Sequence, residues 1–223
     1  MSFWKVVVGA VLYLWHYRLP LLKALLVPFA LMLVLELADR LHASSAVDLL
    51  SALVWLAVFA VFAITTHRIV LLGPGSVPPW GIGWWSKREW RFLLYLFGFT
   101  GLLLACSVVL SFLALIPFLG VLVGLLLTCW LAARLSLVFP ALALEEQASF
   151  RRSWQMTRDY QGLMIAVVVL FPVLIAVVLV TFRELSGAFA VIALLSSLVL
   201  VFEVAVLSVA YQHIAAEHQK QCQ

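Results

Sequence analysis

Long apolar runs alternate with short polar segments along the whole chain. Because the hydrocarbon core of a bilayer is about 30 Å thick, a helix needs about 20 apolar residues to cross it. Six runs meet that length, and they cover residues 20–39, 46–69, 92–115, 119–140, 162–182 and 188–211. No stretch shows the apolar and polar alternation over about ten residues that a lipid-facing β-barrel strand needs. The pattern therefore predicts an all-α, polytopic membrane protein in which residues 1–223 form a single membrane domain with six transmembrane helices.

Proline and glycine mark the breaks between spans. The segment Gly73–Gly83 cannot continue a helix, because its prolines lack an N–H group and its glycines favour turns. Pro117 and Gly120 separate the third span from the fourth. Pro172 lies within the fifth span, where neighbouring helices can satisfy the backbone carbonyl that it frees.

A basic and aromatic amphipathic stretch precedes each pair of spans. These stretches cover about residues 3–17, 84–91 and 149–160, and Ser149 is expected to cap the third. Such helices lie in the membrane interface, with aromatic rings at the acyl boundary and cations at the head groups. We therefore predict three interfacial helices on the cytoplasmic side, which would make the fold a threefold internal repeat. The alternative interpretation is that aromatic belts and basic loops create this pattern in unrelated membrane proteins.

Composition supports a lipid environment for this chain. Hydrophobic residues make up 66% of it and charged residues 11%, and the mean hydropathy is +1.17. Soluble domains contain about 45–50% apolar and about 25% charged residues, so a water-soluble fold is excluded. The cysteines form no metal-binding spacing, and neither a metal nor another cofactor is expected.

The distribution of positive charge predicts the orientation. With six spans, only Arg40 and Arg183 fall on one side of the membrane. Lys and Arg are retained in cytoplasmic loops, so we predict that both termini lie in the cytoplasm. The remaining Lys and Arg residues all fall on the predicted cytoplasmic side: Lys5, Arg18, Lys23, Arg68, Lys87, Arg88, Arg91, Arg134, Arg151, Arg152, Arg158 and Lys220.

Several charged residues fall within the predicted spans, where a charge near the bilayer centre costs about 2.5–3.5 kcal/mol on insertion scales. Arg134 and Glu203 lie at matching distances from the outer ends of the fourth and sixth spans. At about 1.5 Å per residue their depths are equal, so we expect an ion pair that clamps the two helices. The alternatives are a role in substrate or proton passage, or separate positions. In that last case Arg134 extends to the head groups and Glu203 pairs elsewhere or faces water.

Other polar residues fall at the predicted inner surface. His67 and Arg68 end the second span, where they act either as an interfacial anchor or as contacts for phosphate and lipid head groups. Anionic head groups of membrane lipids are the expected partners on the cytoplasmic side. The candidate residues for that contact are Lys87, Arg88, Arg91, Arg151, Arg152 and Arg158.

The third amphipathic stretch carries a family resemblance. Arg134–Pro140, then Glu145, then Ser149–Arg158 resemble a recurrent pattern of YciC-like bacterial inner-membrane proteins and of the membrane domain that precedes some glycerophosphodiester phosphodiesterase domains. His67 and Arg68 followed by Leu71–Gly73 resemble a further segment of related proteins. The phosphodiesterase domain itself is absent from this chain. The resemblance implies a six-helix bacterial membrane protein and carries no enzymatic activity over.

No motif in the sequence predicts catalysis. HExxH, GxSxG and Walker sequences are all absent, so no catalytic residue is proposed. Nucleic-acid binding is not expected, because the basic residues are spread along the inner surface, where anionic lipid is nearer. The leading interpretation is a non-enzymatic integral membrane protein with lipid or membrane-partner contacts. The alternatives are a small transporter or channel that uses Arg134 and Glu203, and an intramembrane enzyme.

Overall fold

The computed structural model describes residues 2–41, 45–81, 83, 85–113, 117–186 and 189–221. Helices make up most of these residues, and no strand occurs among them. Six helical segments of this part of the chain are long and apolar enough to cross a membrane. The predicted all-α, polytopic fold is confirmed.

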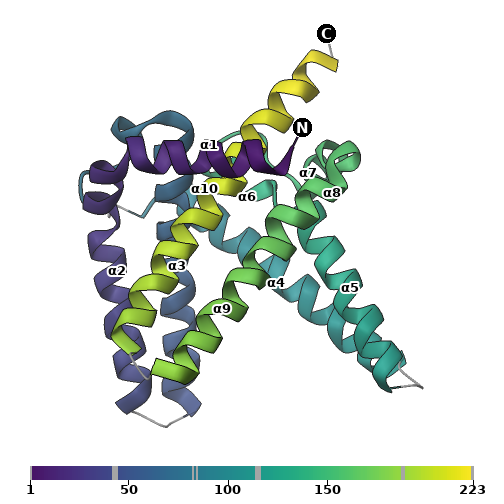
Figure 1. The fold of residues 1–223 in the computed structure, drawn as a ribbon, viewed down its shortest axis with the longest axis horizontal. Helices are drawn as coiled ribbons and strands as arrows, with labels where there is room; N and C mark the ends of the chain where they lie inside the picture. Colours follow the sequence, from purple (N-terminus) through teal and green to yellow (C-terminus); the bar gives the residue numbers. More distant parts are fainter. Residues whose placement is uncertain are drawn as a thin grey trace.

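The first unit is an amphipathic helix followed by a hairpin. Helix α1 (Phe3–His16) lies across one end of the molecule, and a single turn residue separates it from α2 (Arg18–Leu41). Helices α2 and α3 (Ser45–Leu72) pack side by side, roughly perpendicular to α1 (Figure 1). A separate helix thus occupies the first of the three stretches predicted to lie in the interface.

The described residues of the second unit form no separate interfacial helix, which differs from the prediction for residues 84–91. Helix α4 (Lys87–Leu113) begins at Lys87 and continues without a break into the third span. No helix-breaking residue follows in its first turns, so the basic segment becomes the start of the span itself. Helix α5 (Pro117–Leu135) forms a hairpin with α4, and the short helix α6 (Val138–Ala143) follows. The predicted threefold repeat is therefore not regular.

The third unit contains a capped short helix and an irregular span. The side-chain oxygen of Ser149 accepts a hydrogen bond from the backbone N–H of Arg152 at 3.1 Å, so the predicted N-cap is confirmed. A π-helical turn ends two residues before Pro172 in the fifth span, and such turns are common where a helix bends. The segments of this unit are α7 (Phe150–Met156), η2 (Arg158–Tyr160), α8 (Gln161–Ile165), η3 (Ala166–Leu170) and α9 (Phe171–Ser186).

Helix α10 (Phe189–Gln221) is longer than the predicted sixth span. It has 33 residues, which corresponds to about 50 Å at 1.5 Å per residue. Its polar end extends past α1 at the same end of the molecule as the first residues of the chain (Figure 1). Along its length α10 packs on α1, α3 and α9.

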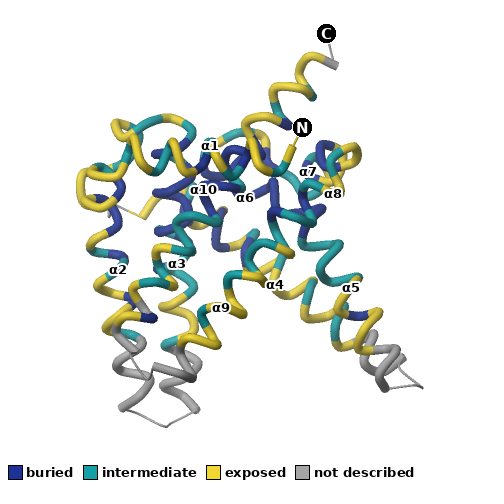
Figure 2. The backbone as a smooth tube through the Cα atoms, viewed as in Figure 1, coloured by how far each residue is buried: buried dark blue, intermediate teal, exposed yellow. Residues whose placement is uncertain are grey.

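Buried residues gather at one end of the molecule, where α1, α6 and α7 lie, and we call it the α1 end (Figure 2). Large side chains fully buried there include Phe92, Leu137 and Ile214. Away from this end the helices expose long apolar faces, with Leu94 at 70% and Leu174 at 64% exposure. Apolar faces of this extent are stable only when lipid or another apolar partner covers them.

The connector between α3 and α4 folds back onto α2. The backbone N–H of Gly81 closes a turn by donating to the carbonyl of Pro78 at 2.9 Å. Gly81 has a φ of +69°, and a Cβ atom at this position would lie 1.8 Å from the carbonyl oxygen of Ala24. Only glycine fits this close approach, which fixes the connector as one wall of the site described next.

Candidate functional site

The side chain of Arg68 ties three segments together at the α1 end. Its Nε donates to the carbonyl of Ser76 at 3.0 Å, and its Nη1 donates to the carbonyl of Ala143 at 2.9 Å. Nη1 also lies 3.2 Å from Oε1 of Glu145. Arg68 therefore joins the end of α3 to the connector and to the end of α6.

Glu145 lies between two arginines that come from different spans. Its Oε1 accepts from Nη1 of Arg68 and from Nη1 of Arg88, the latter at 2.9 Å. The backbone of Glu145 has a φ of +62°, a left-handed conformation that non-glycine residues adopt rarely. Its carboxylate offsets part of the positive charge that two guanidinium groups bring to one place.

Arg88 also binds the carboxylate of the residue that follows it. Its Nε and Nη2 donate to Oε1 of Glu89 at 2.9 and 2.6 Å. The other oxygen of Glu89 accepts from the backbone N–H of Ser86 at 2.8 Å and from the Ser86 hydroxyl. The Ser86 hydroxyl oxygen in turn accepts from the N–H of Arg88 at 3.1 Å. Ser86 and Glu89 thus cap the start of α4 and hold the Arg88 guanidinium in place.

A basic pocket opens beside this network. Its volume is about 390 Å³, and Lys87, Arg88 and Arg91 line it together with Glu145. Lys87 and Arg91 are exposed and lie four residues apart on one face of α4. Neither of these two cations has a carboxylate partner among the described residues. They are therefore free to bind an anion from outside the chain.

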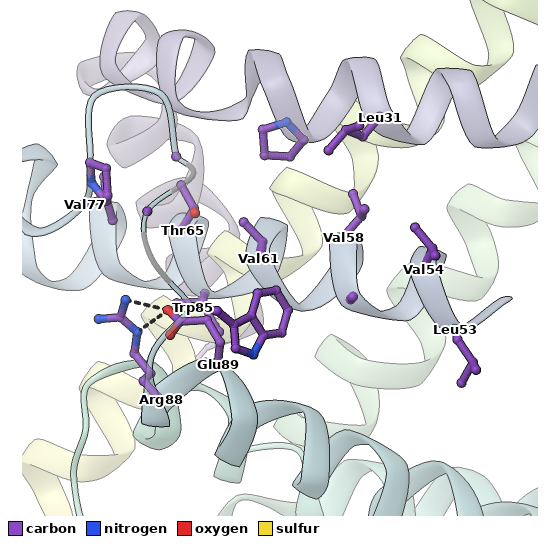
Figure 3. A pocket seen from close by; sticks show the side chains of 16 residues that line it. Leu31, Leu53, Val54, Val58, Val61, Thr65, Val77, Trp85, Arg88 and Glu89 are labelled. Atoms are coloured by element: carbon purple, nitrogen blue, oxygen red, sulfur yellow. Dashed lines mark hydrogen bonds and ion pairs between the residues drawn. The ribbon is translucent and has the colours of Figure 1, made fainter. Parts of the chain in front are cut away.

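An apolar cavity of about 480 Å³ adjoins the basic pocket. Pro28 and Leu31 of α2 form one wall, apolar residues from Leu53 to Ile64 of α3 form a second, and Val77, Pro78 and Gly81 of the connector form a third. At one end of the cavity Trp85, Arg88 and Glu89 stand close together, while Leu53 and Val54 lie at the opposite end (Figure 3). The polar side chains Thr65, Arg88 and Glu89 thus lie away from the end of the cavity that Leu53 and Val54 form (Figure 3).

Arg88 is shared by the two hollows, since it lines both the basic pocket and the apolar cavity. The resulting site is amphipathic, with cations at the α1 end and a hydrocarbon-like cleft directed along the spans. This arrangement suits a ligand with an anionic group attached to an apolar chain.

His67 lies outside this site and is buried, with 1% exposure. Its Nδ1 lies 2.7 Å from the hydroxyl oxygen of Ser208, which also donates to the carbonyl of Val204 at 2.7 Å. His67 therefore joins α3 to α10 inside the protein. This position gives it no contact with a head group.

Arg134 is buried at the end of α5, with 3% exposure. Its guanidinium stacks 4.5 Å from the ring centroid of Trp154, and Nε and Nη1 have no hydrogen-bond partner among the described residues. Its backbone carbonyl accepts from the hydroxyls of Ser153 and Thr157 at 2.9 and 3.1 Å. These contacts fasten α7 to the end of the fourth span.

The predicted ion pair between Arg134 and Glu203 does not form between these two described side chains. The reason is lateral separation, because the η3 segment packs on both α5 and α10 and so lies between them. Equal depth therefore does not bring the two residues together. Glu203 instead lines a separate cavity among α2, α3, α9 and α10.

The remaining head-group candidates lie on or beside α7. Arg151 and Arg158 are exposed at the α1 end. Arg152 is half-buried, and its guanidinium lies 3.5 Å from the carboxylate of Glu146 and donates to the carbonyl of Gln147 at 3.0 Å. Tyr211 of α10 also donates to Glu146, at 2.6 Å. Arg152 is thus held within the fold, while Arg151 and Arg158 face outward.

Sequence reasoning missed the carboxylates that organise the site. The spacing of Ser86 and Glu89 is that of a capping box, and this signal alone predicts the start of α4 at Lys87. No local signal indicates that Glu145 meets Arg68 and Arg88, because they come from segments far apart in the chain.

Two further observations bear on the identity of the site. Among the described residues, no group of three or more His, Cys, Asp or Glu side chains is placed to hold a metal ion. The resemblance of residues 134–158 to YciC-like proteins stays a prediction. No family model, no curated protein and no solved structure matches this chain.

Proposed function

We propose that the protein binds an anionic phospholipid of its own membrane at the amphipathic site between α2, α3 and α4. The phosphate group contacts Lys87, Arg88 and Arg91, and an acyl chain fills the apolar cavity. The observation that carries this proposal is that Arg88 lines both the basic pocket and the apolar cavity.

The apolar wall has a length that suits an acyl chain. From Ile64 to Leu53 the wall follows about three turns of α3, or about 16 Å at 1.5 Å per residue. Its side chains are aliphatic and run along the spanning direction (Figure 3). A phospholipid bound here therefore keeps its chain parallel to the neighbouring lipids and its head group at the α1 end.

The charge of the basic pocket favours phosphate. Glu145 and Glu89 already engage Arg88, whereas Lys87 and Arg91 remain without an internal counter-charge among the described residues. A cation near anionic lipid contributes about 1 kcal/mol. Guanidinium groups also match the geometry of phosphate oxygens, which favours this head group over a zwitterionic one whose ammonium adds positive charge.

We infer that the α1 end faces the cytoplasm of a bacterial inner membrane. The excess of Lys and Arg at this end supports that orientation, because basic residues are retained on the cytoplasmic side. Helix α1 and the end of α10 lie at the same end of the molecule, as an even number of spans requires (Figure 1). Reporter fusions at the two termini test this inference, and opposite locations of the two reporters would contradict it.

Lipid binding is tested in nanodiscs by native mass spectrometry with phosphatidylglycerol in a phosphatidylcholine background. The double substitution Lys87→Gln and Arg91→Gln removes the two unpaired cations. At about 1 kcal/mol for each, we expect a 10- to 30-fold loss of phosphatidylglycerol affinity. The matched control is Lys5→Gln with Lys220→Gln, which removes the same charge from exposed positions elsewhere at the α1 end.

The control variant is expected to bind within about twofold of the unmodified protein, since a twofold change is only about 0.4 kcal/mol. An equal loss of phosphatidylglycerol affinity in the two double variants would show that binding depends on the overall positive charge and not on a specific site. Equal affinity for phosphatidylglycerol and phosphatidylcholine would refute the proposal. Soluble glycerol phosphate distinguishes recognition of the head group alone from recognition of the whole lipid. Because it lacks an acyl chain, we expect it not to compete with phosphatidylglycerol for the site.

The chain-binding part of the site is tested separately with Ala57→Phe. Ala57 lines the apolar cavity, so a phenyl ring at this position occupies the space assigned to the acyl chain. We expect weaker binding of long-chain phosphatidylglycerol and little change for a short-chain form. An unchanged preference for long chains would place the lipid elsewhere.

A further inference from the structure

A second cavity, of about 340 Å³, lies among α2, α3, α9 and α10, apart from the site proposed for the anionic lipid. Met32, Trp55, Leu179 and Leu200 form part of its wall. The wall also contains Glu203, which lies within the sixth candidate span. A carboxylate thus reaches a largely apolar hollow inside the membrane-spanning part of the molecule.

The Glu203 carboxylate has no hydrogen bond or ion pair with any described residue. No Lys, Arg or His is among the described residues that line the cavity. A charge in apolar surroundings is costly unless an opposite charge pairs with it. The cavity therefore favours a ligand that brings its own positive charge.

An aromatic ring supplies a second feature of cation recognition. The Trp55 ring lines the cavity and stacks on Phe59, with ring centroids 5.8 Å apart and an angle of 11° between the planes. The face of an indole ring attracts cations, most strongly those that have lost their water. The stacking on Phe59 holds the indole in one orientation.

We propose that this cavity binds a lipophilic organic cation, an ammonium or phosphonium carrying aromatic or alkyl groups. Glu203 supplies the counter-charge, Trp55 a π face, and the aliphatic residues an apolar lining. A metal ion does not fit well, because it favours several carboxylate or carbonyl oxygens. Among the described lining residues Glu203 is the only acidic one, and the other side-chain oxygens are the hydroxyls of Ser196 and Ser197. The inference is independent of the proposed lipid site, which differs in location and in the sign of its ligand.

The test uses the full chain in phosphatidylcholine nanodiscs and tetraphenylphosphonium as the probe, with empty nanodiscs to subtract partitioning into lipid. Equilibrium dialysis measures saturable binding to the protein. Glu203→Gln keeps the shape of the side chain and removes its charge, and we expect at least a tenfold loss of affinity. The matched control is Glu217→Gln, which removes one carboxylate from an exposed position of the same helix, and we expect an affinity within twofold of the unmodified protein.

Two more measurements distinguish cation binding from apolar packing. Trp55→Leu keeps an apolar side chain without the indole ring, and we expect about a threefold loss. Triphenylphosphine oxide has a similar shape without the positive charge, and we expect it not to displace tetraphenylphosphonium. Saturable binding that is equal in the unmodified and Glu203→Gln proteins would overturn the proposal, as would the absence of saturable binding. Unchanged circular dichroism of Glu203→Gln excludes misfolding as the cause of a loss.

Discussion

Replacing Gly81 with alanine is expected to destabilise the protein far more than the same change elsewhere in the connector. A Cβ atom at Gly81 would lie 1.8 Å from the carbonyl oxygen of Ala24, and this contact is to backbone rather than to a flexible side chain. The φ of +69° adds strain for any residue with a Cβ atom. Either α2 or the connector has to move to relieve the contact.

The magnitude follows from two separate costs. A left-handed backbone conformation costs an L-residue about 1–2 kcal/mol. Overpacking at a site that is already filled costs about 1–3 kcal/mol. The free energy of unfolding of Gly81→Ala is therefore expected to fall by about 2–5 kcal/mol.

Two other glycines of the same connector isolate these costs. Gly73 has a φ of +88° and a ψ of 170°, a backbone region that essentially only glycine adopts, and no atom lies within 4 Å of an added Cβ. Gly73→Ala therefore measures a backbone cost alone, about 1–3 kcal/mol. Gly75 has neither a positive φ nor a close neighbour. Gly75→Ala is expected to be neutral or to stabilise by about 0.4–1 kcal/mol, because it restricts the unfolded chain.

The assay is unfolding in mixed micelles by titration with sodium dodecyl sulfate, followed by far-ultraviolet circular dichroism. The expected order of stability is Gly75→Ala, then Gly73→Ala, then Gly81→Ala. Equal stability of the Gly73 and Gly81 variants would refute the close approach of the connector to α2. Because Gly81 lines the apolar cavity, its variant is also expected to lose affinity for phosphatidylglycerol.

Two smaller changes test the packing of α7 and of α3 on α10. Ser149→Ala removes the acceptor for the Arg152 N–H, and we expect a loss of about 1 kcal/mol in the same titration, with Ser149→Asp close to the unmodified protein. Full stability of the alanine variant would show that this cap does not matter. Ser208→Ala leaves the buried Nδ1 of His67 without its partner, and we expect a loss of about 1–3 kcal/mol. Ser208→Thr keeps the hydroxyl, so a loss as large as that of alanine would count against the hydrogen bond.

Hydropathy was sufficient to predict the spanning segments, because insertion into lipid depends on local composition. Helix α2 extends two residues beyond each end of the predicted range 20–39. The largest difference between a predicted span boundary and the observed helix boundary is at α10. There the predicted span ends at residue 211, and the helix continues to Gln221. A polar segment that follows a span continues the helix when no proline or glycine stops it, and hydropathy does not detect that continuation.

The candidate site was only partly predictable, since its parts meet through tertiary contacts. The cationic residues of α4 follow from the charge pattern, because Lys87 and Arg91 stand at the start of a span. The apolar cavity cannot be predicted from the sequence in this way, because its shape depends on how the connector folds back at Gly81. The expected pair of Arg134 and Glu203 was wrong because depth along two helices says nothing about which helix lies between them.

The packing of α1 against α10 joins the two extremes of the chain. Val6 and Ala10 are fully buried in the same cluster as Val209 and Ala210. During synthesis, the first helix is complete long before its covering partner leaves the ribosome. Until α10 is made, we expect α1 to stay bound to the membrane surface through its amphipathic face. A truncated chain that lacks α10 would leave that face uncovered and accessible to quality-control proteases.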